Sequence, residues 1–400
     1  MKNLKLFNFA LLFLLLLIIF YFLSNIWIGA DASIYLSYAR DIAAGKVLYI
    51  DLPCTYTPLV IYINSLIFNI FNFQYLYFIL FQYLIILISA IFLFKLSMLF
   101  RKDTNNSILT CLLYLLTVFS SDGIDFVLEP YLLLFCILAI YLLYKQFFLW
   151  SGVLIGLCFL SKQYGLVYYP ILLILLYLER VLSLKTFIRF TSGFIIPQFL
   201  FLSVMILYFD ISIENLLTQL SGKLYYFDGS TFEVGLLEYL IGGKVLFSLV
   251  TLYFIIFKFN KNSIPFLLMI ILSLAPTLIK TYQHYFLISF PIFYLLWIKS
   301  EMKELLIINK IIFLFMIILN SFLLINRITN YKYKREEQII NSTKALKNYP
   351  RGSEVFIEGE IMYLYLLNDY RNPLDKEHGY RFIYKISEAE KNKFKRLEIN

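Results

Sequence analysis

Long apolar runs, separated by short polar segments, fill most of the chain up to residue 326. A membrane-spanning helix uses roughly 20 apolar residues, and several of these runs have cores of only about 13–16, so their ends must extend into flanking residues. The first run is too long for the core of a cleaved signal peptide, so we interpret it as a retained helix. Eleven runs are predicted to be spans, at 6–28, 75–100, 107–121, 130–144, 147–161, 165–179, 187–209, 239–257, 263–279, 285–298 and 310–326.

The density of charge changes abruptly near Arg327. Residues 327–400 hold 26 charged side chains in 74 positions, against 35 in the first 326. We therefore predict an all-α polytopic transmembrane domain over 1–326, followed by a small soluble domain over 327–400. The tail is too short for a large core of its own and should pack over the outer loops. Its pattern predicts a small α/β element with a helix near 334–348, a strand at 354–358 and a short helix near 360–367.

Two apolar or amphipathic segments follow the first span. Residues 32–44 place Ile34, Tyr35, Tyr38 and Ile42 on one stripe at helical spacing, and Gly45 ends that pattern. A second apolar run begins after Pro58 and ends near residue 73. We interpret the second run as a helix lying in the membrane interface, because a crossing there would invert the charge bias of every later loop.

The composition agrees with a membrane protein. Hydrophobic residues make up 61% of the chain and charged residues 15%, whereas soluble domains average about 45–50% and 25%. These values exclude an ordinary soluble enzyme, a disordered protein and a nucleic-acid binder, despite a net charge of +9. The four cysteines form neither a disulfide framework nor a zinc-ligand spacing.

The Lys and Arg residues set the orientation, because loops rich in them stay in the cytoplasm. An internal N-terminus places most of these residues inside, and it places the loops 29–74 and 210–238, together with the tail, outside. Eleven of the fifteen acids of the membrane domain then face outward. We therefore expect extracytoplasmic chemistry in an integral protein of a bacterial cell membrane. The long loop 210–238 either covers the acceptor site or only connects two spans.

A specific order of residues runs through the first outer loop: Asp31, Tyr35, Ala39-Arg40-Asp41, Gly45, Tyr49, Asp51 and Tyr56-Thr57-Pro58-Leu59. Weaker motifs follow at Ser161-Lys162-Gln163-Tyr164-Gly165, at His284-Tyr285-Phe286, and in the tail at 354–359 with Tyr363 and Tyr365. Together these motifs resemble GT-C fold glycosyltransferases over the whole chain. The most similar branch surrounds glycosyltransferase family 39, with the protein O-mannosyltransferases and the lipid A aminoarabinose transferase, and the RgtA/B/C/D-like bacterial group is also similar. The mannosyltransferases carry a second acid where this chain has Ala32, so the likeness concerns fold and general chemistry.

The resemblance implies a donor sugar on a polyprenyl phosphate and an acceptor attacked on the outer face. The acceptor hydroxyl must lose a proton, and one carboxylate acting as general base contributes typically about 10²–10⁴-fold to such a step. We assign that role to Asp31, which follows the first span. The alternative for Asp31 is a helix N-cap, a position that Asp favours in any protein.

Cations should stabilise the departing phosphate. The candidates are Lys162, Arg40, Lys280 and His284. The alternatives are a snorkelling interface lysine for Lys162, pairing with Asp41 for Arg40, and an interfacial hydrogen-bonding group for His284.

The remaining candidates are outer-loop residues with either an acceptor-binding or a structural role: Tyr35, Asp51, Tyr56, Asp122, Asp125 and Glu129. The last three could also contact a divalent cation, because hard cations prefer oxygen ligands. The alternative that we favour is a solvated loop in which Glu129 begins a helix. No cofactor is indicated, and divalent-metal dependence is left open.

Two other functional classes fit a polytopic membrane protein. A lipid-linked oligosaccharide flippase or transporter would be expected to show internal repeats and midplane charges, whereas here the charges lie near the ends of the spans. An O-antigen ligase or polymerase would concentrate reactive basic residues in a large late loop, whereas here the informative loop is the first. A glycosyltransferase that uses a lipid-linked sugar and an extracytoplasmic acceptor is the leading hypothesis.

Overall fold

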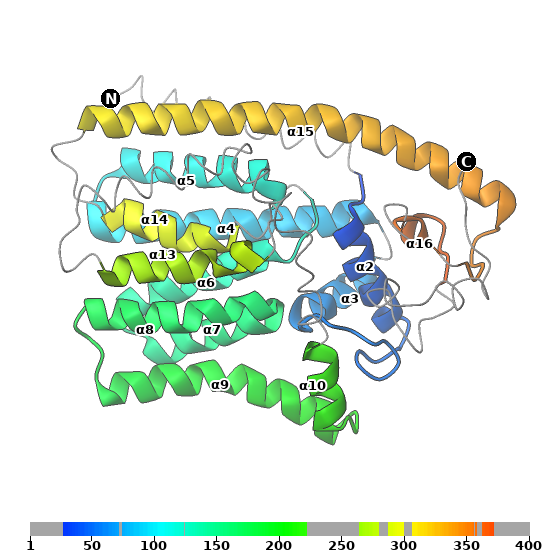
Figure 1. Cartoon of the computed structure of the whole chain (residues 1–400), viewed down its shortest axis with the longest axis horizontal. Helices are drawn as coiled ribbons and strands as arrows, with labels where there is room; N and C mark the ends of the chain where they lie inside the picture. Colours follow the sequence, from blue (N-terminus) through cyan, green and yellow to red (C-terminus); the bar gives the residue numbers. More distant parts are fainter. Residues whose placement is uncertain are drawn as a thin grey trace.

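A computed structural model describes residues 27–71, 74–123, 125–221, 264–279, 287–299, 306–355, 357 and 362–371. The predicted eighth span lies outside these residues, as does the first except for its last two residues, Trp27 and Ile28. The other nine predicted spans coincide with helices: α4 Tyr75–Arg101, α5 Thr104–Val118, α6 Glu129–Tyr144, α7 Phe148–Ser161, α8 Tyr168–Leu178, α9 Leu184–Leu207, α13 Ile264–Ile279, α14 Phe290–Lys299 and α15 Leu306–Asn348. Figure 1 shows that these helices run side by side as a bundle.

Two of the described helices, α4 and α9, are long and apolar enough to cross a membrane. Five of the other predicted spans are shorter apolar helices. Two short irregular helices extend the bundle at its end: the π-helix η1, Phe119–Gly123, after α5, and the 3₁₀-helix η2, Gln163–Val167, between α7 and α8. The described fold is mostly helical, and the count of eleven spans stays a prediction.

Glycines permit the close contact between α7 and α9. A Cβ atom on Gly152 would lie 2.0 Å from the carbonyl oxygen of Phe190, and one on Gly193 would lie 2.0 Å from that of Leu149. Real Cβ atoms never approach a backbone oxygen so closely, so the two helix backbones touch at positions where only glycine fits. Such small-residue contacts are typical of helix pairs inside membranes.

The predicted first outer loop, 29–74, forms two helices at one end of the bundle, α2 Ala30–Ala43 and α3 Leu59–Phe71. The predicted amphipathic helix is confirmed, with Ile34, Tyr35 and Tyr38 buried. Gly45 ends it in a left-handed conformation with φ +96°. The predicted outer loop at 210–238 begins with a further helix, α10 Ile213–Ser221, at the same end of the bundle in Figure 1.

The tail continues from α15 without a break at residue 327. This helix has 43 residues, and it joins the predicted eleventh span and the predicted tail helix into one element. It is followed by the one-turn helix α16, Leu364–Leu367. The expected strand at 354–358 is wrong at its described positions, where Glu354 makes only an isolated bridge to Arg371. The α/β character predicted for the tail is therefore not seen in its described part.

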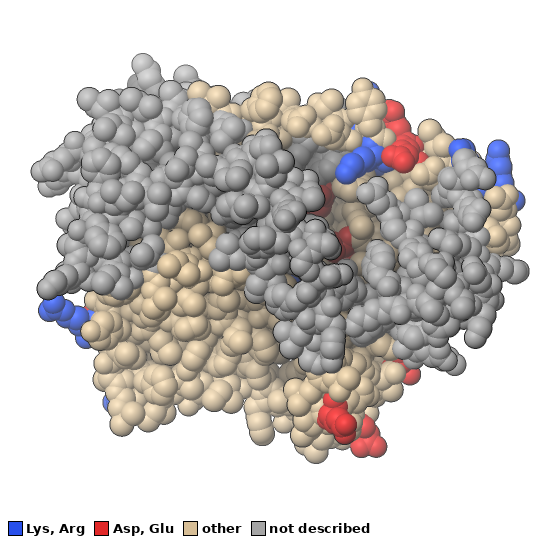
Figure 2. All heavy atoms as spheres, viewed as in Figure 1, with Lys and Arg blue, Asp and Glu red and all other residues tan. Residues whose placement is uncertain are grey.

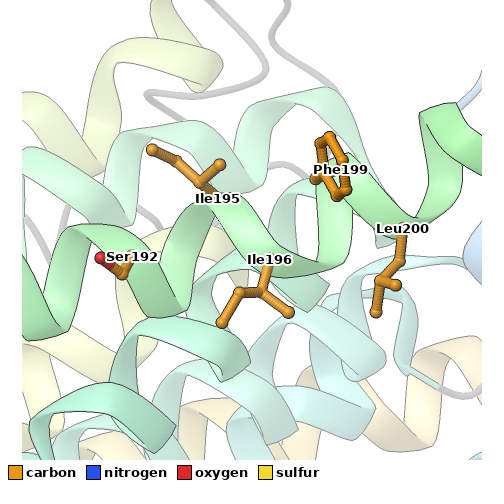
Figure 3. A pocket seen from close by; sticks show the side chains of 5 residues that line it. All are labelled: Ser192, Ile195, Ile196, Phe199 and Leu200. Atoms are coloured by element: carbon orange, nitrogen blue, oxygen red, sulfur yellow. The ribbon is translucent and has the colours of Figure 1, made fainter.

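A groove of about 410 Å³ lies on the face of α9 that is exposed on the surface of the bundle. Figure 3 shows its lining, Ser192, Ile195, Ile196, Phe199 and Leu200, all from this one helix. The lining is apolar except for one serine hydroxyl. It offers no group for acid–base chemistry, so the candidate site must be sought elsewhere.

Candidate functional site

Asp31 lies in the first turn of α2 and is half-buried. The N-cap of this helix is Gly29, so the interpretation of Asp31 as the N-cap is wrong. The Gly29 carbonyl accepts hydrogen bonds from the Ser33 amide (2.9 Å) and the Ser33 hydroxyl (2.8 Å), which closes the first helical turn around Asp31. The positive end of the helix dipole stabilises a carboxylate placed in this turn.

Helix α15 holds the segment that leads into α2. The buried Gln338 side chain accepts a hydrogen bond from the Ile28 amide (3.0 Å) and donates one to the Ile28 carbonyl (2.7 Å). One turn earlier on α15, the Lys334 ammonium lies 4.2 Å from the centre of the Trp27 ring. Both backbone groups of Ile28, two residues before α2 begins, are thus hydrogen-bonded to a helix near the other end of the sequence.

Two further glutamines hold the segment between α2 and α3. Gln219, on α10, accepts from the Cys54 amide (2.9 Å) and donates to the Tyr49 carbonyl (2.7 Å). Gln163, on η2, donates to the Thr55 carbonyl. Elements far apart in the sequence thereby supply the hydrogen bonds that a loop cannot make within itself. The segment between α2 and α3 therefore has a defined conformation that other elements hold in place.

Aromatic side chains attach α2 to the same segment. The rings of Tyr35 and Tyr56 meet edge to face with centroids 4.8 Å apart, and both side chains are buried. The Tyr38 hydroxyl donates to the Pro53 carbonyl (2.8 Å). Burial raises the pKa of Tyr49 well above its usual value, so its hydroxyl stays protonated and donates to the Tyr56 carbonyl (2.5 Å). The predicted residues Tyr35 and Tyr56 therefore pack the loop onto α2.

Lys162 and Glu129 form a buried ion pair. Lys162 follows the end of α7 and Glu129 begins α6, and each side chain is 1% exposed. The snorkelling interpretation of Lys162 is wrong, because its ammonium group is buried rather than placed at an interface. Glu129 begins a helix as expected, but the expected solvated setting is wrong for it. The pair joins the start of α6 to the end of α7, beside Gln163.

Arg40 attaches α2 to the tail. Its guanidinium donates to Asp41 (3.0 Å) and to the Tyr365 carbonyl (2.6 Å), and it lies 3.6 Å from the Asp369 carboxylate. The Asp41 carboxylate also pairs with Lys46 at 3.4 Å. Pairing of Arg40 with Asp41 is therefore the interpretation that the structure supports, and the guanidinium that we considered for phosphate binding already has protein partners.

The other predicted candidates are not brought together by the described residues. Asp51 is exposed, and its carboxylate accepts from the Val47 amide (2.8 Å) within a turn. The Asp125 carbonyl accepts from Gln82 (2.5 Å), and Asp122 lies in η1. Across the part of the chain that is described, no three His, Cys, Asp or Glu side chains form a group that could hold a metal ion. Lys280 and His284 lie outside the described residues.

Sequence reasoning missed two side chains of α15 that adjoin this site. Gln338 gives no local signal, because a glutamine in a charged helix looks like any solvated residue. Arg335 lies three positions before Gln338 and thus on the same side of the helix. It is half-buried, and desolvation lowers the pKa of its guanidinium. Figure 2 shows Lys, Arg, Asp and Glu atoms gathered where the charged half of α15 passes α2, beside a largely uncharged helical body.

Comparisons with known proteins agree with this architecture. The family model of dolichyl-phosphate-mannose-protein mannosyltransferases matches residues 55–208, a range that includes Glu129 and Lys162 and begins after Asp31. No curated protein matches the chain. Among solved structures, ArnT from Cupriavidus metallidurans bound to undecaprenyl phosphate matches with a TM-score of 0.61 and 9% sequence identity, covering 90% of this chain and 84% of ArnT. The chain has the GT-C glycosyltransferase fold, a membrane-protein fold, as its first-loop motif predicts.

Proposed function

We propose that this protein is an integral-membrane glycosyltransferase that moves a sugar from a polyprenyl-phosphate carrier to an acceptor on the extracytoplasmic side. One observation carries the proposal: Asp31 is a half-buried carboxylate in the first turn of α2, and the chain on both sides of α2 is hydrogen-bonded to other elements. The fold is shared with ArnT, whose solved structure contains undecaprenyl phosphate.

The proposed reaction is a single displacement at the anomeric carbon. The acceptor hydroxyl attacks that carbon while Asp31 takes its proton, and the bond from the anomeric carbon to the phosphate oxygen breaks. The phosphate leaves with the bonding electron pair and stays attached to its polyprenyl chain. Attack from the face opposite the leaving group inverts the anomeric configuration. The phosphate is a good leaving group, so one carboxylate is sufficient for the proton transfer.

Phosphate binding requires cations near Asp31. Lys162 and Arg40 have acidic partners in the protein, and we assign both of them to holding the scaffold together. Arg335 is a better candidate, because it lies on the side of α15 that meets the start of α2 and no acid among the described residues pairs with it. A guanidinium binds phosphate oxygens through parallel hydrogen bonds. Lys280 and His284 keep the phosphate role predicted from the sequence.

In vitro transfer tests the proposal. The purified protein in lipid nanodiscs is incubated with a panel of polyprenyl-phosphate sugars and with envelope glycolipids, polysaccharides and peptides as acceptors. We expect one donor class to yield a glycosylated acceptor and free polyprenyl phosphate. Parallel reactions with EDTA determine whether a divalent cation takes part. Translocation of a labelled lipid-linked sugar across sealed vesicles, with no transfer to any acceptor, would contradict the proposal and favour a flippase.

A further inference from the structure

The amide of Gln338 is hydrogen-bonded to both backbone groups of one residue. It accepts from the Ile28 N–H and donates to the Ile28 C=O, as a neighbouring β-strand would. An amide side chain can do both at once, whereas a carboxylate only accepts and an alkyl group does neither. Gln338 is also buried, with 3% of its surface exposed, so water does not replace these bonds.

The position of Ile28 determines where helix α2 begins. Gly29 follows directly, with φ −67° and ψ 163°, and its carbonyl receives the first hydrogen bonds of the helix. Asp31 lies within this turn. The path from the Gln338 amide to Asp31 passes through Ile28, Gly29 and Ala30. The backbones of Ile28 and Gly29 are both hydrogen-bonded, so we expect a shift at Ile28 to be transmitted to the carboxylate.

Helix α15, which holds Ile28, is itself attached to other elements both before and after Gln338. Towards its middle, α15 packs against α5 and η1, where Asn320 accepts a hydrogen bond from Ser120 (2.6 Å). Beyond Gln338, Asn341 donates to the Tyr363 hydroxyl (3.0 Å) and Ser342 donates to Asn368 (2.5 Å). Figure 1 shows α15 running along the length of the bundle, at its edge, before it passes α2. A helix attached at both places can hold Ile28, and with it the start of α2, in a fixed position.

We infer that Gln338 is a positioning residue for the transfer reaction: its paired hydrogen bonds to Ile28 set the placement of the Asp31 carboxylate. The inference rests on the proposed role of Asp31 as general base. A displacement of about 1 Å at a reacting group costs on the order of 100-fold in rate. The two hydrogen bonds are therefore expected to affect turnover more than donor binding.

The first arm of the test needs no activity. Hydrogen–deuterium exchange of the full-length protein in nanodiscs is compared for wild type, Q338A and N341A. Asn341 is the matched control, because it is an amide on the same helix that contacts Tyr363 and not the segment before α2, and because the Ser342–Asn368 bond still anchors α15 in N341A. We expect amide exchange over residues 27–33 to be about tenfold faster in Q338A and unchanged in N341A, as local opening becomes easier. Equal exchange in wild type and Q338A would overturn the inference.

The second arm measures steady-state transfer with whichever donor the wild type uses, per amount of folded protein. Q338A is expected to lower kcat roughly 10–100-fold with little change in the KM for the donor. Unchanged kcat alongside faster exchange would overturn the positioning role, because Ile28 would then be held for stability alone. A wild type without transferase activity would refute the proposed function. The exchange measurement would still decide whether the hydrogen bonds of Gln338 hold Ile28 in place.

The Q338E variant adds a readout that a purely structural contact would not give. Near neutral pH its carboxylate cannot donate to the Ile28 carbonyl, but the protonated acid can. Burial raises the pKa of a carboxyl group above its usual value of about 4.3, whereas Lys334 and Arg335, one turn earlier on α15, lower it, so the comparison extends to acid pH, where the carboxyl group becomes protonated. The activity of Q338E relative to wild type should therefore rise as pH falls, while that of Q338A stays flat. A flat ratio for Q338E would contradict the inference.

Discussion

Asp31 is placed where a carboxylate is both stabilised and able to receive a proton. The first turn of α2 favours the negative charge, and the side chain is only partly buried. The asparagine in Asp31→Asn has nearly the same shape but cannot act as a base. We expect D31N to lower transfer by about 10²–10⁴-fold with unchanged yield of folded protein.

The control for D31N is Glu214→Gln, which removes an exposed acid from the nearby helix α10. Both variants are assayed with the same donor and acceptor, and product is quantified by mass spectrometry. Transfer by D31N at the wild-type rate would rule out Asp31 as the base.

The Lys162–Glu129 pair leads to a prediction about stability. No described residue donates a hydrogen bond to the second carboxylate oxygen of Glu129, so Lys162 is the main compensation for this buried charge. Removing one partner of a buried ion pair costs about 3–5 kcal/mol, whereas replacing both by neutral groups is often tolerated. The unfolding temperature should therefore be markedly lower in Lys162→Met than in wild type. The double variant E129Q/K162M should recover most of this decrease. A single variant as stable as wild type would contradict the buried pair.

At the residue scale, the sequence predicts what depends on local order. Asp31 stands out because its neighbours Tyr35, Arg40 and Asp41 recur in a known motif. The Gln338 contact joins positions separated by 310 residues, and the Gln219 contact with Cys54 joins positions separated by 165. A glutamine has the same local pattern whether its amide faces water or another backbone. Contacts of this kind are therefore invisible until the chain is folded.

Helix α9 has one face that contacts α7 and another that is exposed. A larger side chain should destabilise the protein on the contact face and have little effect on the exposed face. At Gly193, any Cβ atom would collide with the Leu149 carbonyl. The neighbouring Ser192 is exposed in the groove of Figure 3. We expect Gly193→Leu to destabilise the protein by about 3 kcal/mol or more, because backbone cannot yield as a side chain can.

Ser192→Leu adds the same side chain one residue away and should leave the unfolding temperature within a few degrees of wild type, since surface changes usually cost less than about 0.5 kcal/mol. Fluorescence-detected thermal unfolding in detergent compares the two variants. Equal unfolding temperatures for G193L and S192L would contradict the close contact of α7 and α9.

At the element scale, apolar periodicity predicts helices well because a helix needs only its own backbone to satisfy its hydrogen bonds. The predicted ranges of α4, α6, α7 and α9 agree with the structure to within a few residues. The continuity of α15 was missed, because a change from apolar to charged residues normally marks a boundary. Helical backbone can cross that change without interruption, so charge density and secondary structure report different boundaries here.

Over the whole molecule, Arg40 links the first outer loop to the tail across 325 residues of sequence. It contacts the Tyr365 carbonyl and the Asp369 carboxylate, both close to α16. In Arg40→Ala these contacts are lost together, while the ion pair of Asp41 with Lys46 remains. We expect the tail to undock more often and to be cleaved several-fold faster by trypsin at Arg351 or Arg371, following the population of the open form.

The control for this experiment is Arg189→Ala, which removes an exposed arginine from α9. Cleavage is followed by gel electrophoresis and mass spectrometry under native conditions. A tail that is as resistant in R40A as in R189A would show that Arg40 does not hold it.

At this scale, the sequence predicts the class of molecule but little of how its helices pack against one another. The excess of apolar residues and the first-loop motif were sufficient for the GT-C fold. They did not indicate that α10, η2 and α15 converge on one loop, because such convergence depends on how helices pack. The place of the candidate site along the chain stays a prediction from the first-loop motif, whereas its supporting contacts required three-dimensional information.

The two ends of α2 are attached by different kinds of interaction. Near its C-terminal end, Arg40, Asp41, Lys46 and Asp369 interact through full charges, which dissolved ions screen. The end that carries Asp31 is attached mainly through the neutral amide of Gln338, which neither titrates nor responds to ionic strength, together with the contact of Lys334 with the Trp27 ring. Added salt is therefore expected to weaken the attachment of α2 to the tail more than it changes the placement of the Asp31 carboxylate.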